Sequence, residues 1–191
     1  MVVAVSGRGS NLLALVDALA GHAEIVISTV ISDRAAPALQ LARERGIPAV
    51  PLADFRDPAE WLARLDHAGC DLLVLAGYLR LVPAAVVAAF SGRIINVHPA
   101  LLPRHGGPGM HGSRVHEAVL AAGDAESGAT VHLVDEVYDR GTILAQGRVA
   151  VPAGATAAEL AGAVLEVEHR LLPAAVVVAA HHGRPVSFEF P

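Results

Sequence analysis

The chain has 191 residues, a formal net charge of −5 and an apolar fraction of 53%. This length predicts one domain with its own core, and a single cysteine excludes an intramolecular disulfide framework. No run of lysine or arginine provides the basic face that nucleic-acid binding requires. We find neither a signal-peptide pattern nor an apolar run long enough to span a bilayer, and we therefore expect a cytoplasmic protein without membrane contacts.

The first half of the chain alternates short apolar runs with helical segments. The expected strands span residues 2–5, 25–31, 49–52, 72–75 and 93–98. The expected helices span residues 12–20, 36–46 and 57–67, and a fourth begins near residue 83. Strands and helices that alternate in short steps indicate a parallel sheet with helices on both faces. We therefore predict an α/β fold, a single-domain, Rossmann-like, doubly wound sheet with a parallel N-terminal half.

The second half of the chain breaks this alternation. Residues 101–112 form an irregular loop rich in glycine and proline, which is typical of a functional lid or binding loop. A helix over 113–122 follows, with Ser113 as its N-cap. Two strands over 128–134 and 142–151 are joined by an acidic turn, which predicts an antiparallel hairpin and therefore a mixed C-terminal half of the sheet.

A long helix and a short tail complete the pattern. The helix runs from Thr156 to about residue 180, and Thr156 with Glu159 forms a capping box. Pro173 lies inside this helix and is expected to kink or split it. The tail over 186–190 alternates apolar and polar residues and predicts an edge strand.

The turn after the first strand, residues 6–11, reads Ser-Gly-Arg-Gly-Ser-Asn. A strand, a glycine-rich turn and a helix together aim free backbone N–H groups and the positive end of a helix dipole at an anion. Gly7 and Gly9 allow a tight turn, and Ser10 or Asn11 is suitable as the N-cap. Two glycines fall short of a dinucleotide motif, so the turn predicts a site for a single phosphate. A simple turn is the alternative.

Residues 94–103 place an amide, an imidazole and a proline at the end of the fifth expected strand. Asn96 and His98 are two residues apart, so their side chains point to the same side of an extended strand. Pro99 ends the strand because it has no N–H for the ladder. Polar groups at the carboxyl end of a parallel strand lie where open α/β sheets bind their ligands. The alternative is that both side chains only cap the strand.

The residue types favour one kind of chemistry. No serine or cysteine has the neighbouring base that an enzyme nucleophile needs, and the ten histidines show no spacing typical of metal ligands, so we expect no metal. Asn96 and His98 can donate hydrogen bonds to an oxyanion, and the turn carboxylate Asp139 favours a charged imidazolium. Such a set fits direct transfer of an acyl group to a substrate that supplies its own nucleophile, such as an amine.

Five segments carry a family resemblance in their order along the chain: Ser6–Asn11, Ala76–Arg80, Asn96–Pro103, Gly128–His132 and Asp139–Gly141. Together they resemble the phosphoribosylglycinamide formyltransferases, a folate-dependent formyltransferase family, and the resemblance covers essentially the whole chain. It implies transfer of a formyl group from 10-formyltetrahydrofolate to the amine of N1-(5-phospho-D-ribosyl)glycinamide (glycinamide ribonucleotide) in purine (IMP) biosynthesis. It also implies that these two small molecules are the partners of a monomer or homodimer.

The resemblance assigns roles to residues of this sequence. Residues 1–98 would form a nucleotide- and phosphate-binding half, and residues 99–191 a folate-binding and catalytic half. Asn96, His98 and Asp139 would be catalytic, with Asp139 raising the pKa of His98, the proton donor. The residues that would bind the ribonucleotide are Gly9, Ser10, Asn11 and Glu168. The residues that would bind folate are Leu79, Arg80, Leu81, Val82, Asn96, Asp135, Glu136, Val137, Tyr138 and Asp139.

Three features depart from the family pattern. Arg8 stands where a small polar residue is expected, Arg56 is the nearest substitute for a folate-contacting arginine expected near residue 58, and the loop over 104–112 is longer and richer in glycine.

The alternatives to this family are other folate-dependent formyl enzymes: a formyltetrahydrofolate deformylase and a sugar-nucleotide or methionyl-tRNA formyltransferase. Deformylases and tRNA formyltransferases carry an additional domain that we do not expect here. A nucleotide-binding module without catalysis is an alternative from a different class. The presence of Asn96, His98 and Asp139 together argues against it, because such a module would need none of the three.

Overall fold

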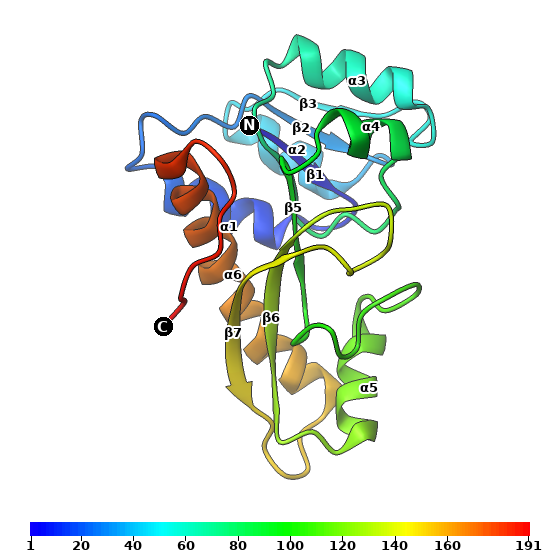
Figure 1. Cartoon of the computed structure of the whole chain (residues 1–191), viewed down its shortest axis with the longest axis vertical. Coiled ribbons are helices and arrows are strands. Elements are labelled where there is room, and N and C mark those ends of the chain that lie inside the picture. The colour runs from blue at the N-terminus through cyan, green and yellow to red at the C-terminus, as the bar shows by residue number, and fades with distance from the viewer.

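One sheet of seven strands runs through the computed structural model, which describes residues 1–191 (Figure 1). The strands are β1 (Val2–Val5), β2 (Thr29–Ser32), β3 (Ala49–Pro51), β4 (Leu73–Leu75), β5 (Ile94–His98), β6 (Glu126–Leu133) and β7 (Ile143–Ala150). Their order is β3-β2-β1-β4-β5-β6-β7. Strands β1 to β5 are parallel, whereas β6 and β7 are antiparallel to their neighbours. The predicted single α/β domain with a parallel first half and antiparallel C-terminal strands is confirmed.

Six helices cover the two faces of the sheet. They are α1 (Ser10–Leu19), α2 (Pro37–Glu44), α3 (Pro58–His67), α4 (Ala84–Ala89), α5 (Ser113–Ala122) and α6 (Ala157–His182). The side chains of β1 alternate between two cores: Val3 and Val5 pack with α1, α2 and α6, whereas Val2 and Ala4 pack with α3 and α4. Figure 1 shows α1 and α6 on one side of the sheet and α3 and α4 on the other. Each valine buried in this way contributes about 1.5–3 kcal/mol, so both helix layers are held to the strand that precedes the glycine-rich turn.

Two local predictions about starts of elements are wrong. β2 begins at Thr29 and not at residue 25, because its partner β1 begins at Val2, which pairs with Thr29. The N-caps of α1 and α5 are the glycines Gly9 and Gly112, not serine or asparagine, and neither makes a side-chain capping bond. Ser10 is therefore the first residue of α1 itself, and its side chain is left for other contacts.

The C-terminal part of the chain also differs from its prediction. α6 is not split at Pro173, because Leu171, Leu172 and Val176 bury this stretch in the core and offset the loss of one backbone hydrogen bond. The predicted capping box of Thr156 is confirmed. The tail is not a strand: a single backbone hydrogen bond, from Phe188 N–H to the carbonyl of Leu144, joins it to β7. No helix has both the length and the apolar character needed to cross a membrane.

Candidate active site

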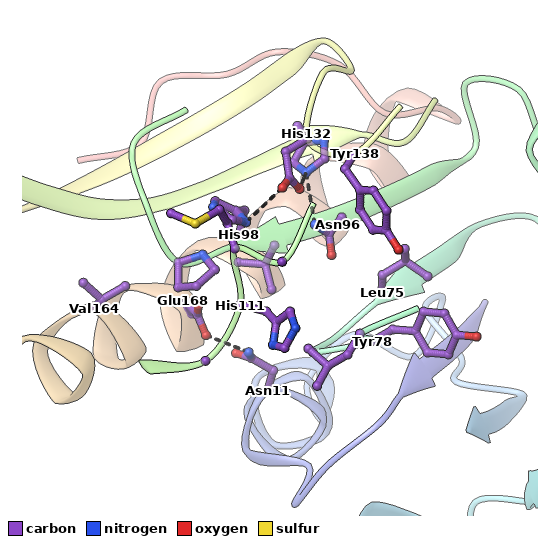
Figure 2. A pocket seen from close by; sticks show the side chains of 18 of the residues that line it. Asn11, Leu75, Tyr78, Asn96, His98, His111, His132, Tyr138, Val164 and Glu168 are labelled. Atoms are coloured by element: carbon purple, nitrogen blue, oxygen red, sulfur yellow. Dashed lines mark hydrogen bonds and ion pairs between the residues drawn. The ribbon is translucent and has the colours of Figure 1, made fainter. Parts of the chain in front are cut away.

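A cavity of about 650 Å³ lies at the carboxyl ends of β1, β4 and β5 (Figure 2). In the sheet, β2 and β3 lie on one side of β1, and β4 and the later strands lie on the other side. The order in which the strands are added therefore reverses at β1, and the cavity lies next to this point. This is the place at which doubly wound sheets bind their ligands. The walls also include the start of α1, the loop after β5, the β6–β7 turn and α6. Segments from the whole length of the chain meet there.

Strand β5 carries two of the predicted catalytic residues. Asn96 and His98 face the same side of the strand, as the two-residue period predicts, and both line the cavity. The neighbouring strand β6 places His132 opposite Asn96 and Thr130 opposite His98. The side chain of His98 is only 4% exposed. Its hydrogen bonds are therefore decided by protein groups and bound ligands and not by bulk water.

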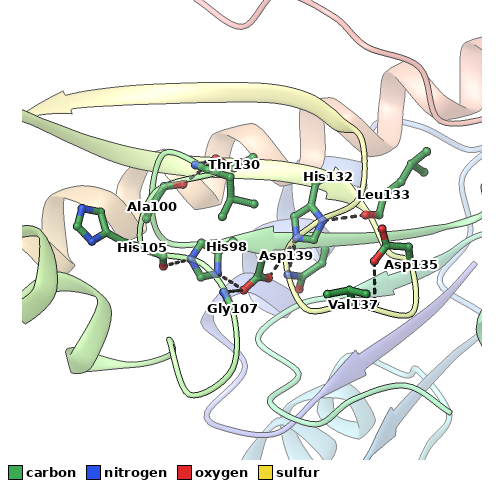
Figure 3. A network of polar contacts seen from close by, with 12 residues as sticks. His98, Ala100, His105, Gly107, Thr130, His132, Leu133, Asp135, Val137 and Asp139 are labelled. Atoms are coloured by element: carbon green, nitrogen blue, oxygen red, sulfur yellow. Dashed lines mark hydrogen bonds and ion pairs between the residues drawn. The ribbon is translucent and has the colours of Figure 1, made fainter. Parts of the chain in front are cut away.

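Asp139, in the β6–β7 turn, lies between two histidines (Figure 3). Its Oδ2 atom is 3.6 Å from Nδ1 of His98, and its Oδ1 atom is 3.5 Å from Nε2 of His132. The backbone N–H of Gly107 donates to Oδ2 at 2.8 Å. Burial raises the pKa of the Asp139 carboxyl, but the hydrogen bond from His132, the charge of His98 and the Gly107 N–H together hold the pKa below its usual value. Asp139 is therefore an anion at neutral pH.

The pKa of His98 differs from the prediction. Burial lowers the pKa of its imidazole, and this effect outweighs the raising effects of Asp139 and of the hydrogen bond to the carbonyl of His105. The predicted net rise is therefore wrong, although Asp139 does act in the predicted direction. In the ligand-free protein His98 is neutral at neutral pH, and its proton is on Nε2, which donates to the His105 carbonyl at 2.8 Å. Nδ1, which faces Asp139, is the atom left to gain and lose a proton.

The orientation of the Asn96 amide depends on the proton of His132. Nδ1 of His132 donates to the carbonyl of Leu133 at 2.8 Å, and its Nε2 is 3.0 Å from Nδ2 of Asn96. When Nε2 carries no proton, it accepts from one N–H of the amide, and the second N–H and the amide oxygen are left for other partners. When Nε2 carries a proton, it donates to the amide oxygen, and the turned amide offers its NH₂ group to the cavity. His132 therefore determines how the Asn96 amide is oriented, and with it which of its groups face the cavity.

The glycine-rich turn and α6 meet in another wall of the cavity. Nδ2 of Asn11 donates to Oε2 of Glu168 at 2.8 Å, while Oδ1 of Asn11 has no partner (Figure 2). Burial raises the pKa of Glu168 to about 7, and the hydrogen bond from Asn11 offsets only part of this rise. Gly9 has a φ of 88°, and a Cβ atom there would lie 2.8 Å from Cβ of Ala38. Only glycine fits this turn, which brings Ser10 and Asn11 to the cavity.

The segment after β4 and the β6–β7 turn form an apolar wall. Leu79, Leu81 and Val137 are each more than two fifths exposed, which is unusual for large apolar side chains outside a binding surface. All but one of the predicted folate residues line the cavity, and the exception is Glu136. The predicted substitute Arg56 does not line it either. Of the predicted ribonucleotide residues, Gly9 shapes the turn without lining the cavity, whereas Ser10, Asn11 and Glu168 do line it.

Sequence reasoning gave no role to three histidines of the cavity wall, His111, His116 and His132. His132 was visible only as the end of a family-like segment, and its contact with Asn96 depends on the register of two strands far apart in sequence. His116, on α5, is buried and its Nδ1 atom has no partner. No group of three or more histidine, cysteine or acidic residues is placed to hold a metal ion.

This fold and cavity define an α/β protein of the doubly wound class whose polar side chains, buried acid–base groups among them, converge on one cavity where the strand order reverses. Comparisons with known proteins narrow this class. A family model described as formyl transferase matches residues 1–176. The chain belongs to the formyl transferase family.

Two relatives and one solved structure illustrate this membership. The chain is 41% identical over 181 residues to "Phosphoribosylglycinamide formyltransferase, chloroplastic" of Arabidopsis thaliana, covering 90% of this chain and 62% of that protein. It is 35% identical over 181 residues to "Phosphoribosylglycinamide formyltransferase" of Escherichia coli (strain K12), covering 91% and 83%. The crystal structure of phosphoribosylglycinamide formyltransferase from Anaplasma phagocytophilum superposes with a TM-score of 0.87 at 35% identity, covering 95% and 86%. The chain spans about three fifths of the length of the two plant relatives.

Proposed function

We propose that this chain transfers a formyl group from 10-formyltetrahydrofolate to the amine of glycinamide ribonucleotide, a step of purine biosynthesis. The observation that carries the proposal is the convergence of Asn96, His98 and Asp139 on one cavity, in a chain whose relatives are named for this reaction. The substrate amine is the nucleophile, which explains why the cavity needs no activated serine or cysteine. The partners are then two small molecules, and the cytoplasmic location remains a prediction.

The chemistry follows from where the protons lie. The amine nitrogen attacks the formyl carbon, and the formyl oxygen gains negative charge as the carbon becomes tetrahedral. Nδ1–H of a protonated His98 and the NH₂ group of Asn96 donate to this oxyanion. The developing charge favours the imidazolium that burial disfavours in the ligand-free protein. The attacking amine loses its proton through water to Asp139, the carbon–nitrogen bond to the folate breaks, and the folate nitrogen leaves with the Nδ1 proton of His98. Asp139 then passes its proton to Nδ1 of His98, 3.6 Å away, which restores both groups.

The remaining walls suit the two substrates. The turn that contains Ser10 and Asn11 offers N–H groups at the start of α1 to the phosphate of the ribonucleotide. Glu168 and the free Oδ1 of Asn11 are placed to bind its hydroxyl groups. Leu79 and Leu81, together with Val137 and Tyr138 on the β6–β7 turn, provide exposed apolar side chains for the folate ring system. One cavity thus holds both substrates, as direct transfer requires.

The test is to supply 10-formyltetrahydrofolate to the purified protein with and without glycinamide ribonucleotide and to follow the folate absorbance and the products. The proposal predicts formylated ribonucleotide, and no turnover without the amine. Formate release that does not depend on the amine would instead identify a formyltetrahydrofolate deformylase. Transfer only to an amino sugar nucleotide or to methionyl-tRNA would refute the acceptor while retaining the formyl donor.

A further inference from the structure

We propose that His105 and Asp124 are positioning residues for His98, although neither lines the cavity. They hold the imidazole ring of His98 in the one tautomer that leaves Nδ1 available for catalysis. The link to His98 runs through the main-chain carbonyl of His105, and the side chain of His105 anchors that carbonyl to Asp124. The catalytic consequence rests on the proposed function, whereas the structural link can be tested without it.

The backbone of His105 makes the contact with His98. Nε2–H of His98 donates to the His105 carbonyl at 2.8 Å (Figure 3). His105 has a φ of 55°, in the left-handed region that residues with a Cβ atom adopt only when their surroundings hold them there. The direction of this carbonyl is therefore not fixed by local preference. It needs an anchor elsewhere.

Asp124 provides that anchor. Its Oδ2 atom lies 2.7 Å from Nε2 of His105, and its other carboxylate oxygen pairs with Arg104. Asp124 directly follows Gly123, which caps the C-terminal end of α5. The side chains of Asp124 and His105 are only 9% and 14% exposed, so the pair is shielded from solvent in a way that most surface ion pairs are not. The Asp124–His105 and Asp124–Arg104 contacts thereby hold the turn that contains the His105 carbonyl against the C-terminal end of α5.

The same short segment also fixes the partner of His98. Two residues beyond His105, the N–H of Gly107 donates to Asp139 Oδ2. Between them, a Cβ atom on Gly106 would lie 3.1 Å from Cβ of Asp139 and 2.5 Å from a methyl group of Leu102, so this backbone packs directly on the turn of Asp139. Residues 105–107 therefore set the positions of both members of the His98–Asp139 pair.

The expected consequence concerns the tautomer of neutral His98. With the carbonyl in place, the proton is confined to Nε2 and Nδ1 is free to receive a proton beside Asp139. Without it, the proton is free to move to Nδ1, where it donates to the Asp139 carboxylate. Such a ring has its lone pair on Nε2, away from the cavity, and therefore cannot accept a proton on the reactive side. An orienting group with this function is known to affect catalysis strongly in other histidine-dependent enzymes.

Asp124 is well suited to a test because it lies apart from the substrates. It lines a second cavity of about 400 Å³ together with Glu126 and Arg148, and no residue of this cavity lines the first one. The experiment compares Asp124→Ala with the conservative Asp124→Asn, which keeps an oxygen for the His105 side chain. The matched control is Glu126→Ala, which breaks the exposed Glu126–Arg148 pair in the wall of the same cavity. Circular dichroism and melting curves verify that each variant is folded.

The decisive readout is the ¹⁵N NMR spectrum of the His98 ring in the ligand-free protein at about pH 8, where a histidine with a lowered pKa is neutral. The His98 signals are assigned by their loss in His98→Gln. We expect protonated Nε2 in the unmodified protein, in Asp124→Asn and in Glu126→Ala, and a shift toward protonated Nδ1 in Asp124→Ala. In Asp124→Ala we also expect kcat to fall roughly 10- to 100-fold, the range for outer residues that orient metal-bound histidines, with little change in KM.

A second variant keeps the test informative if Asp124→Ala does not fold. His105→Ala removes the anchor from the other side and predicts the same change in the His98 spectrum. An unchanged His98 tautomer in a folded Asp124→Ala or His105→Ala protein would overturn the proposal, even if the melting temperature fell, because a merely structural role would lower only stability. A tautomer shift in a protein that transfers no formyl group in any form would uphold the link while refuting the proposed function.

Discussion

The buried carboxyl of Glu168 leads to a quantitative prediction for Glu168→Gln. Burial raises the pKa of Glu168 to about 7 from a reference value of 4.5. A carboxyl with a raised pKa stabilises the folded state fully below the pKa of the unfolded chain, and this contribution is lost as the pH rises through the folded pKa. The difference in pKa corresponds to about 3 kcal/mol of unfolding free energy between about pH 4 and pH 8. Glutamine resembles the protonated carboxyl and keeps an oxygen for the N–H of Asn11.

The measurement is urea unfolding of both proteins at several pH values across this window. Because glutamine does not titrate, we expect the stability of Glu168→Gln relative to the unmodified protein to rise by up to about 3 kcal/mol from pH 4 to pH 8, with most of the change between pH 5 and pH 8. The exposed Glu189→Gln serves as a control and should show no such rise. A stability difference that is independent of pH would refute the conclusion that Glu168 is protonated by burial.

Three further predictions concern the turn before α1 and the histidine pair. Asp139→Asn should lower the pKa of His98 further below its ordinary value, because the carboxylate that raises it is lost, and a histidine NMR titration that shows no fall would contradict this. Gly9→Ala should lower the free energy of unfolding in urea by about 1–3 kcal/mol, because its Cβ atom would meet Ala38 and its φ is positive. Gly7→Ala is the control and should not destabilise the fold, because Gly7 has open space around it and no positive φ. Equal effects of the two substitutions would be inconsistent with the close contact to Ala38. His132→Ala should reduce kcat by up to about 10²-fold, because Asn96 then loses the group that turns its amide, and an unchanged kcat would show that His132 does not orient Asn96.

The features that could be predicted from sequence depend on short-range geometry. The two-residue period of a strand was sufficient to place Asn96 and His98 on one side of β5, and the capping pattern of Thr156 and Glu159 was sufficient to start α6. The carboxyl ends of β1 and β5 meet at one edge because parallel strands share their direction. The glycine-rich turn and the Asn96–His98 strand end therefore lie at the same edge of the sheet, as the shared strand direction requires.

The features that could not be predicted depend on tertiary packing. The pKa of His98 falls because its side chain is almost completely buried, and burial of one side chain cannot be read from its neighbours in sequence. The pairing of His132 with Asn96 depends on the register of two distant strands. Pro173 does not split α6 because the core on both sides of it holds the helix together. In each case a contact between distant segments outweighs the local preference.

The central claim is that His98 exchanges the proton that accompanies formyl transfer. Its most direct test is the kcat for transfer from 10-formyltetrahydrofolate to glycinamide ribonucleotide in His98→Ala, with the affinity of both substrates measured separately by calorimetry. We expect kcat to fall at least ~10²-fold, the usual cost of losing an acid–base group, while both dissociation constants change little. A variant that retains more than about a tenth of the original kcat would contradict this assignment of the proton donor, since such a small loss is well below that cost.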